Sequence, residues 1–215
     1  MVAMKEKDSP RALFLAVNAT PDSPFQADPG DESPVVRLDE VLGSLKKSSA
    51  QNLLLLIDAG RLGPNWRLGH LSNDLPSQIK SEVEALGLQN LQVIVSTNVG
   101  ETSWTMDQSQ RSVFSYYVLE GLNGAADGWH TTESGVNQGD ATQNQRISCS
   151  ELASYLQHHV QKWANQHRGV TQSVVWLGAR QTAANFDLVA LQDSKEPASD
   201  TATEEKPKEA SATDK

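Results

Sequence analysis

The stretch NLLLLIDAG, residues 52–60, carries a continuous apolar run into an aspartate, an alanine and a glycine. A short run of Leu and Ile that ends in a small-residue turn is typical of a strand buried on both faces of a parallel sheet. Open α/β folds bind their ligands at the edge formed by the carboxyl ends of such strands. Asp58, Ala59 and Gly60 are therefore predicted to lie at a candidate site.

Three more apolar runs have the same character, and segments with helical periodicity separate them. Alternation of strands and helices predicts an α/β fold, here a three-layer sandwich with a mainly parallel sheet and right-handed crossovers. The last helix should begin at Ser148, because Ser148 and Glu151 have the spacing of a capping box, and Gly87 is suited to end the second helix. The expected strands are 12–17, 52–58, 91–97 and 172–178, and the expected helices lie near 38–45, 75–86, 114–121 and 149–163.

The composition excludes several classes of partner. The chain has 215 residues and a formal net charge of −9, and it has no cluster of Lys and Arg of the kind that phosphate contacts need, so we expect no nucleic-acid partner. A helix needs about 20 apolar residues to span a bilayer, and no apolar run in this sequence approaches that length, so no membrane partner is expected. A single cysteine allows no intrachain disulfide and favours a reducing, cytoplasmic setting.

The chain divides by composition into three parts. Residues 1–11 are charged and polar, and we interpret them as a disordered lead. Residues 12–192 contain all of the strand and helix patterns and form the predicted domain. Residues 193–215 contain no aromatic residue and nothing more apolar than alanine. Such a segment buries too little surface to offset its ordering entropy, so we predict a disordered acidic tail.

The sequence alone offers few candidates for catalytic or ligand-binding residues. There is no glycine-rich phosphate loop, and the histidines lack the spacing of zinc ligands, so we expect no cofactor and no metal. Cys149 lies in the predicted cap of the last helix, where a cysteine is more often a packing residue than a nucleophile. Asp58 has two interpretations, a hydrogen-bond anchor for its turn or a charge that faces a ligand, and the anchor is favoured.

Five segments together resemble the caspase-like peptidases of the metacaspase type, a family of cysteine endopeptidases with bacterial members. The resemblance covers about residues 12–191, and it rests on the order and spacing of the segments more than on any one motif. The segments are LLLLIDAG, LQVIVSTNVGETSW, SVFSYYVLEGLNGAADG, RISCSELASYLQHHV, and TQSVVWLG followed by NFDLVAL.

The resemblance implies peptide hydrolysis by a Cys–His dyad at the carboxyl ends of adjacent strands. The cysteine position of the family's Asp-Ala-Cys turn is Gly60 here, and Asn18 occupies the histidine position. Glycine offers no nucleophile and an asparagine amide is no base near neutral pH, so we expect an inactive pseudoprotease that binds or scaffolds. Asp58 matches the family's aspartate, which implies an acidic pocket for a basic P1 side chain of a bound peptide.

Two departures from the family leave alternatives open. Family members begin with two strands and a helix for which residues 1–11 leave no room. We therefore expect these elements from a missing amino-terminal part of the same protein or from a homotypic partner, beside a protein or peptide ligand. An active hydrolase that uses another group, such as Cys149 or His70, is the second hypothesis. The third is an unrelated doubly wound α/β domain that binds a ligand or signals.

Overall fold

The part of the chain that the structure describes is a mixed α/β fold built from small sheets and four α-helices. The computed structural model describes residues 2–6, 9–15, 35–61, 73–107, 110–130, 142–178 and 185–191. The predicted tail 193–215, Asn18 and His70 lie outside these residues. None of the helices within the described ranges has both the length and the apolar character that crossing a bilayer requires.

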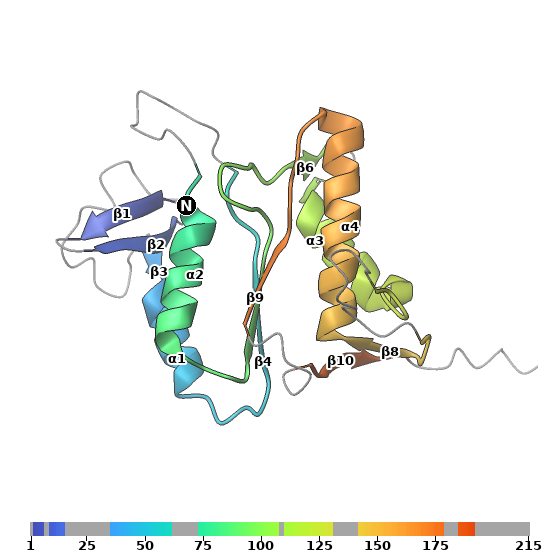
Figure 1. The fold of residues 1–215 in the computed structure, drawn as a ribbon, viewed down its shortest axis with the longest axis horizontal. Coiled ribbons are helices and arrows are strands. Elements are labelled where there is room, and N and C mark those ends of the chain that lie inside the picture. Colours follow the sequence, from blue (N-terminus) through green and yellow to red (C-terminus); the bar gives the residue numbers. More distant parts are fainter. Residues whose placement is uncertain are drawn as a thin grey trace, which may run out of the picture.

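A three-stranded sheet lies at the centre of Figure 1. It consists of β4 (Leu53–Ile57), β5 (Leu91–Val95) and β9 (Val175–Gly178), in the order β4-β5-β9. β4 and β5 run parallel, in the register Leu53↔Leu91, whereas β5 and β9 run antiparallel. Every residue of β5 is buried, as expected for a central strand.

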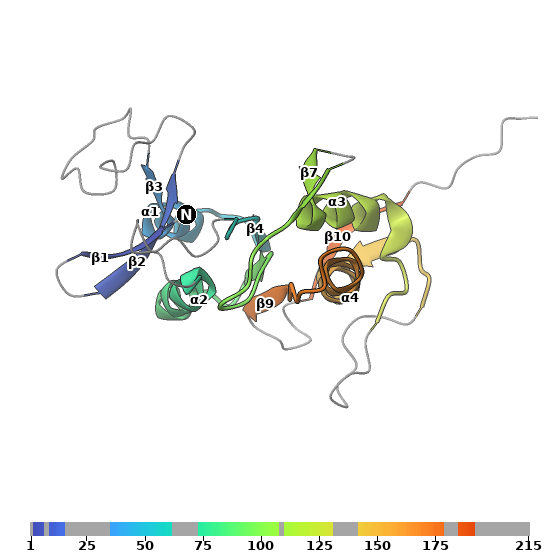
Figure 2. The same ribbon diagram turned by 90° about the horizontal axis from the view of Figure 1, so that it is seen from above.

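Helices cover both faces of this sheet (Figures 1 and 2). Alternate residues of β5 point to opposite faces, so Val93 joins a core with α1 and α2 while Ile94 joins a core with α3 and α4. The helices are α1 (Leu38–Lys46), α2 (Leu75–Leu86), α3 (Val113–Glu120) and α4 (Cys149–Arg168). These four agree with the helices expected from periodicity.

Two helix ends form as the sequence predicts. Ser148 caps α4, its hydroxyl accepting from the Glu151 backbone N–H while the Glu151 carboxylate accepts from the Ser148 N–H, a complete capping box. Gly87 ends α2 in the left-handed conformation, at φ 66°. After α3 the chain continues as a π-helical turn, η4 (Gly121–Ala125).

A second sheet lies beyond α1 and α2, and it contains the strand expected at 12–17. It contains β1 (Val2–Glu6), β2 (Ser9–Leu15) and β3 (Val35–Arg37), all paired antiparallel. The segment expected as a disordered lead thus carries β1 and the start of β2. The strand expected at 12–17 joins this outer sheet because Ala12 and Phe14 pack into the α1–α2 core from the side opposite β4.

Two short antiparallel pairs complete the described fold. β6 (Thr105–Met106) and β7 (Arg111–Ser112) form a hairpin before α3, and β8 (Arg146–Ser148) pairs with β10 (Asp187–Ala190). Among the described strands, parallel pairing occurs only between β4 and β5. The expectation of a mainly parallel sheet is therefore wrong for the part of the chain that the structure describes.

Candidate functional site

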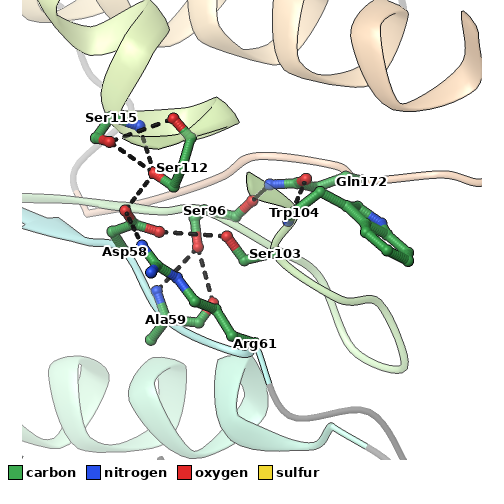
Figure 3. Close-up of polar contacts among 9 residues, drawn as sticks. All are labelled: Asp58, Ala59, Arg61, Ser96, Ser103, Trp104, Ser112, Ser115 and Gln172. Carbon is green, nitrogen blue, oxygen red and sulfur yellow. Dashed lines mark hydrogen bonds and ion pairs between the residues drawn. The ribbon is translucent and has the colours of Figure 1, made fainter. Parts of the chain in front are cut away.

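Asp58 follows β4 directly, and its carboxylate has three partners (Figure 3). One oxygen, Oδ1, accepts a hydrogen bond from the Ser103 hydroxyl at 3.2 Å. The other, Oδ2, accepts from the Ser112 hydroxyl and forms an ion pair with the Arg61 Nη2 at 3.1 Å. The Asp58 side chain keeps 24% of its surface exposed. It anchors the turn, and it still faces solvent.

Ser112 connects Asp58 to the start of α3. It is the N-cap residue of that helix, and its hydroxyl oxygen accepts from the Ser115 backbone N–H at 2.8 Å. The carboxylate therefore lies at the amino end of α3, where the helix dipole favours a negative charge. The Ser115 hydroxyl lies 2.7 Å from that of Ser112, which extends the hydroxyl chain into the first turn of α3.

The backbone after Asp58 is held by Ser96, which follows β5. The Ser96 hydroxyl accepts from the Ala59 N–H at 3.1 Å and donates to the Ala59 carbonyl at 2.9 Å. The next carbonyl, that of Gly60, accepts from the Ser103 N–H at 3.0 Å. Three consecutive residues of the turn are thus fixed by side-chain and backbone hydrogen bonds to the segment that follows β5.

Gly60 occupies a space that a larger residue would overfill. Its φ is +90°, a conformation that residues with a Cβ rarely adopt. A Cβ placed there would lie 2.7 Å from the Asn73 Nδ2 and 2.9 Å from the Thr97 Oγ1. Both side chains are buried, and the Asn73 amide is held by the Glu101 carbonyl at 2.9 Å. The position where the resemblance expects the nucleophilic cysteine is therefore shaped around a glycine.

A buried glutamine ties this edge to the last strand of the sheet. The Gln172 Nε2 donates to the Ser96 carbonyl at 3.0 Å, and its Oε1 accepts from the Trp104 N–H at 3.1 Å. Beside it, the Ser173 hydroxyl donates to the Glu101 carboxylate at 2.9 Å. Residues from the segments after β4 and β5 and before β9 thus form one continuous polar network.

Most of these partners are absent from the sequence-based prediction. Ser112 carries a recognisable signal, because a serine directly before an apolar helical segment is a preferred N-cap. Ser96 and Ser103 carry none, since a serine after a strand is equally common in a plain loop. Gln172 lies within the expected strand 172–178. Only its full burial in the structure indicates that it bridges Ser96 and Trp104.

Cys149, the other candidate that lies within the described residues, does not join this network. Cys149 is fully buried in the first turn of α4, and burial raises the pKa of its thiol to about 12. Figure 1 places β8 and β10 at the end of the molecule where α4 begins, and the β6–β7 hairpin near the opposite end. No His, Lys or Cys side chain within the described ranges hydrogen-bonds to Asp58, Ser103 or Ser112.

Within the described residues, the arrangement supplies hydrogen-bond acceptors and donors but no activated nucleophile. A serine hydroxyl bonded to a carboxylate alone lacks the imidazole or amine base that nucleophilic catalysis by serine requires. Among the described residues, no group of three or more His, Cys, Asp or Glu side chains is placed to hold a metal ion. β2 and β4 also belong to separate sheets, so these two strands are not neighbours as a dyad on their ends would require.

No family model, no curated protein and no solved structure matches this chain.

Proposed function

We propose that this chain is a caspase-like domain without peptidase activity, a pseudoprotease that binds a protein or peptide through the edge around Asp58. The observation that carries the proposal is the turn at Gly60. Its positive φ and the closeness of the Asn73 and Thr97 side chains leave no room for a cysteine where the resemblance expects one. The burial of Cys149, with its raised pKa, is a second reason to expect no thiol nucleophile.

Asp58 supports the binding half of the proposal. Two buried serines, Ser103 and Ser112, hold its carboxylate in one orientation, while part of the side chain stays in contact with solvent. A carboxylate fixed before the ligand arrives loses little side-chain entropy on binding, which favours affinity. A basic side chain of a peptide, Arg or Lys, is the ligand group that this charge suits.

The proposal includes the finer fold assignment, a caspase-like three-layer arrangement. What supports it is the packing of α1 and α2 on one face of β4-β5-β9 and of α3 and α4 on the other. The antiparallel β9 and the separate sheet of β2 mean that the assignment rests on the central sheet and its helices. We place the domain in the cytoplasm because its single cysteine is unpaired.

A peptide library tests both halves of the proposal in one preparation. The purified chain is incubated with a mixed library; cleavage products are read by mass spectrometry, and bound peptides are recovered and sequenced. We expect no cleavage and an enrichment of Arg- and Lys-containing peptides among those bound. Asp58→Asn should abolish that enrichment, because it removes the charge and keeps the side-chain shape.

Two results would contradict the proposal. Reproducible cleavage by the unmodified chain would favour the alternative hydrolase, and alkylation of Cys149 would then test whether that thiol is responsible. Binding without any preference for basic peptides, or no binding at all, would favour the unrelated α/β domain.

A further inference from the structure

Arg61 is the one charged partner of Asp58 within the described residues, and it comes from the same turn. Its guanidinium Nη2 lies 3.1 Å from the Asp58 Oδ2, across a separation of three residues. Figure 3 shows the Arg61 side chain turned back along the chain towards Asp58. The protein thus already places a basic side chain on the carboxylate that a basic ligand would need.

The three partners of Asp58 differ in how firmly they are held. Ser103 and Ser112 are almost fully buried, and Ser112 is fixed further by its bond to the Ser115 N–H. Arg61 has 52% of its side chain exposed. An exposed ion pair of this kind gains little, because water screens the attraction and a long side chain loses freedom. Arg61 can therefore leave Asp58 while both serines remain.

Arg61 also limits what else Asp58 can bind. An ionised carboxylate offers about four lone-pair sites, and the three described donors use three of them. A guanidinium ligand binds most strongly when it engages both oxygens with two parallel hydrogen bonds. Because Arg61 and Ser112 both occupy Oδ2, and Ser103 leaves one site only on Oδ1, such a pair cannot form. A basic ligand must displace Arg61 to bind in this way.

We propose that Arg61 is an internal competitor that occupies the Asp58 site in the free protein and lowers its affinity for basic peptides. The inference rests on the proposed function, since it regulates the same carboxylate. At the strength usually measured for exposed ion pairs, the form in which Arg61 is bound to Asp58 is at most severalfold more populated than the form in which Arg61 has left. Removing the competitor should therefore raise the affinity for a basic peptide about two- to sixfold.

The experiment uses the full chain and four terminally blocked pentapeptides that share flanking residues and carry Arg, Lys, citrulline or Glu at the centre. Each is titrated into ¹⁵N-labelled wild type, Arg61→Ala, Arg61→Lys and Arg111→Ala, with the amide shifts of Ser103 and Ser112 as the readout. Arg111 is the matched control, because it is exposed and adjacent to Ser112 but makes no ion pair within the described part of the chain. Its loss changes the net charge by the same amount.

The expected result is tighter binding of the Arg peptide by Arg61→Ala alone, with Arg61→Lys close to wild type and the citrulline and Glu peptides silent. An equal gain in Arg61→Ala and Arg111→Ala would attribute the effect to net charge and overturn the competitor. Unchanged affinity in Arg61→Ala would overturn it too, while the proposed function would stand. If the Arg peptide binds none of the four proteins, the proposed function fails and the competitor with it.

Discussion

Two carboxylates in this protein lie at the amino ends of helices and accept a hydrogen bond from an N-cap serine, yet they differ in exposure. Asp58 meets Ser112 at α3, and Glu151 meets Ser148 at α4. The Asp58 side chain is 24% exposed, whereas Glu151 is 1% exposed. Glu151 accepts from the N–H and hydroxyl of Ser148, both at 2.7 Å, and from the Gly128 N–H at 2.8 Å.

The difference separates a structural carboxylate from the one that we propose binds a ligand. All the described partners of Glu151 are neutral groups, and two of them are backbone N–H groups that have no alternative acceptor once water is excluded. The described partners of Asp58 are all side chains: two serine hydroxyls that can rotate and an arginine that can leave. We infer that Glu151 stabilises the start of α4, while Asp58 both anchors its turn and is available to bind a basic side chain of a ligand.

The largest expected effect comes from removing Glu151. Glu151→Ala removes the acceptor of the buried Ser148 N–H and of the part-buried Gly128 N–H, together with charge-assisted hydrogen bonds, so the free energy of unfolding should fall by about 3 kcal/mol. Urea unfolding followed by circular dichroism measures the change. Glu151→Gln keeps one acceptor oxygen and should lose less.

Asp58→Ala is the matched variant for that comparison. Its hydroxyl partners can turn to other acceptors or to water, so its cost should be about 1 kcal/mol. Equal losses for Asp58→Ala and Glu151→Ala would remove the distinction between the two carboxylates.

Gly60 gives the second-largest effect, and it tests why the Asp58 turn has no nucleophile. Gly60→Ala adds a Cβ at positive φ and against the Asn73 amide, so we expect a loss of about 2 kcal/mol, and Gly60→Cys should lose at least as much. Thermal unfolding measures both. Gly43→Ala is the control, because nothing lies within 4 Å of the added Cβ inside α1, and it should stabilise by about 0.5 kcal/mol. A neutral Gly60→Cys would show that the turn can accept the family's cysteine.

Helix α4, which carries Glu151 in its first turn, also contains a pH-sensitive group, His159. Its Nε2 is buried and has no hydrogen-bond partner among the described residues, and its ring packs against Tyr155 at 4.2 Å between centroids. Burial, with the charges of His158 and Lys162, lowers the pKa of His159. The unfolded chain therefore binds this proton at a higher pH than the folded one does.

The stability from neutral His159 should be present above the ordinary histidine pKa and lost as the pH falls through the lowered one. Unfolding curves measured between pH 7.5 and 5 should show a small decline that His159→Phe reduces. His167→Gln, a change at an exposed histidine of the same helix, should leave the decline unchanged. A decline that His159→Phe leaves intact would assign it to other groups.

The smallest expected effect is that of Arg61→Ala on stability. An exposed ion pair contributes little, so the free energy of unfolding should change by less than about 0.5 kcal/mol. The same urea experiment measures it. A loss as large as that of Asp58→Ala would make Arg61 a structural partner and would contradict its role as a displaceable competitor.

The sequence predicts the helices of this protein better than its sheets. Local signals suffice for helices, as the capping box at Ser148 and the glycine end of α2 illustrate. A strand buried on both faces has the same apolar pattern whichever way it runs, so nothing in residues 172–178 distinguishes the observed antiparallel β9 from a parallel strand. Likewise, the pattern of residues 12–17 predicts burial but not which sheet receives the strand.

The candidate site was predictable in position and not in detail. The apolar run before Asp58 places the carboxylate at a sheet edge, and the structure finds it there. The partners Ser103 and Ser112 lie 45 and 54 residues away in the chain, so their approach depends on the tertiary fold. The tight space at Gly60 depends on Asn73 and Thr97 in the same way.

The polar network behind the Asp58 turn has a consequence for the order in which the protein is made. Gln172 and Ser173 close that network with residues 68 to 76 positions earlier in the chain. Contacts of such long sequence separation form slowly, and domains tend to fold as units during synthesis. On the ribosome, the site around Asp58 should therefore stay incomplete until the segment leading into β9 has emerged, so a nascent chain would engage a partner only after that segment is made.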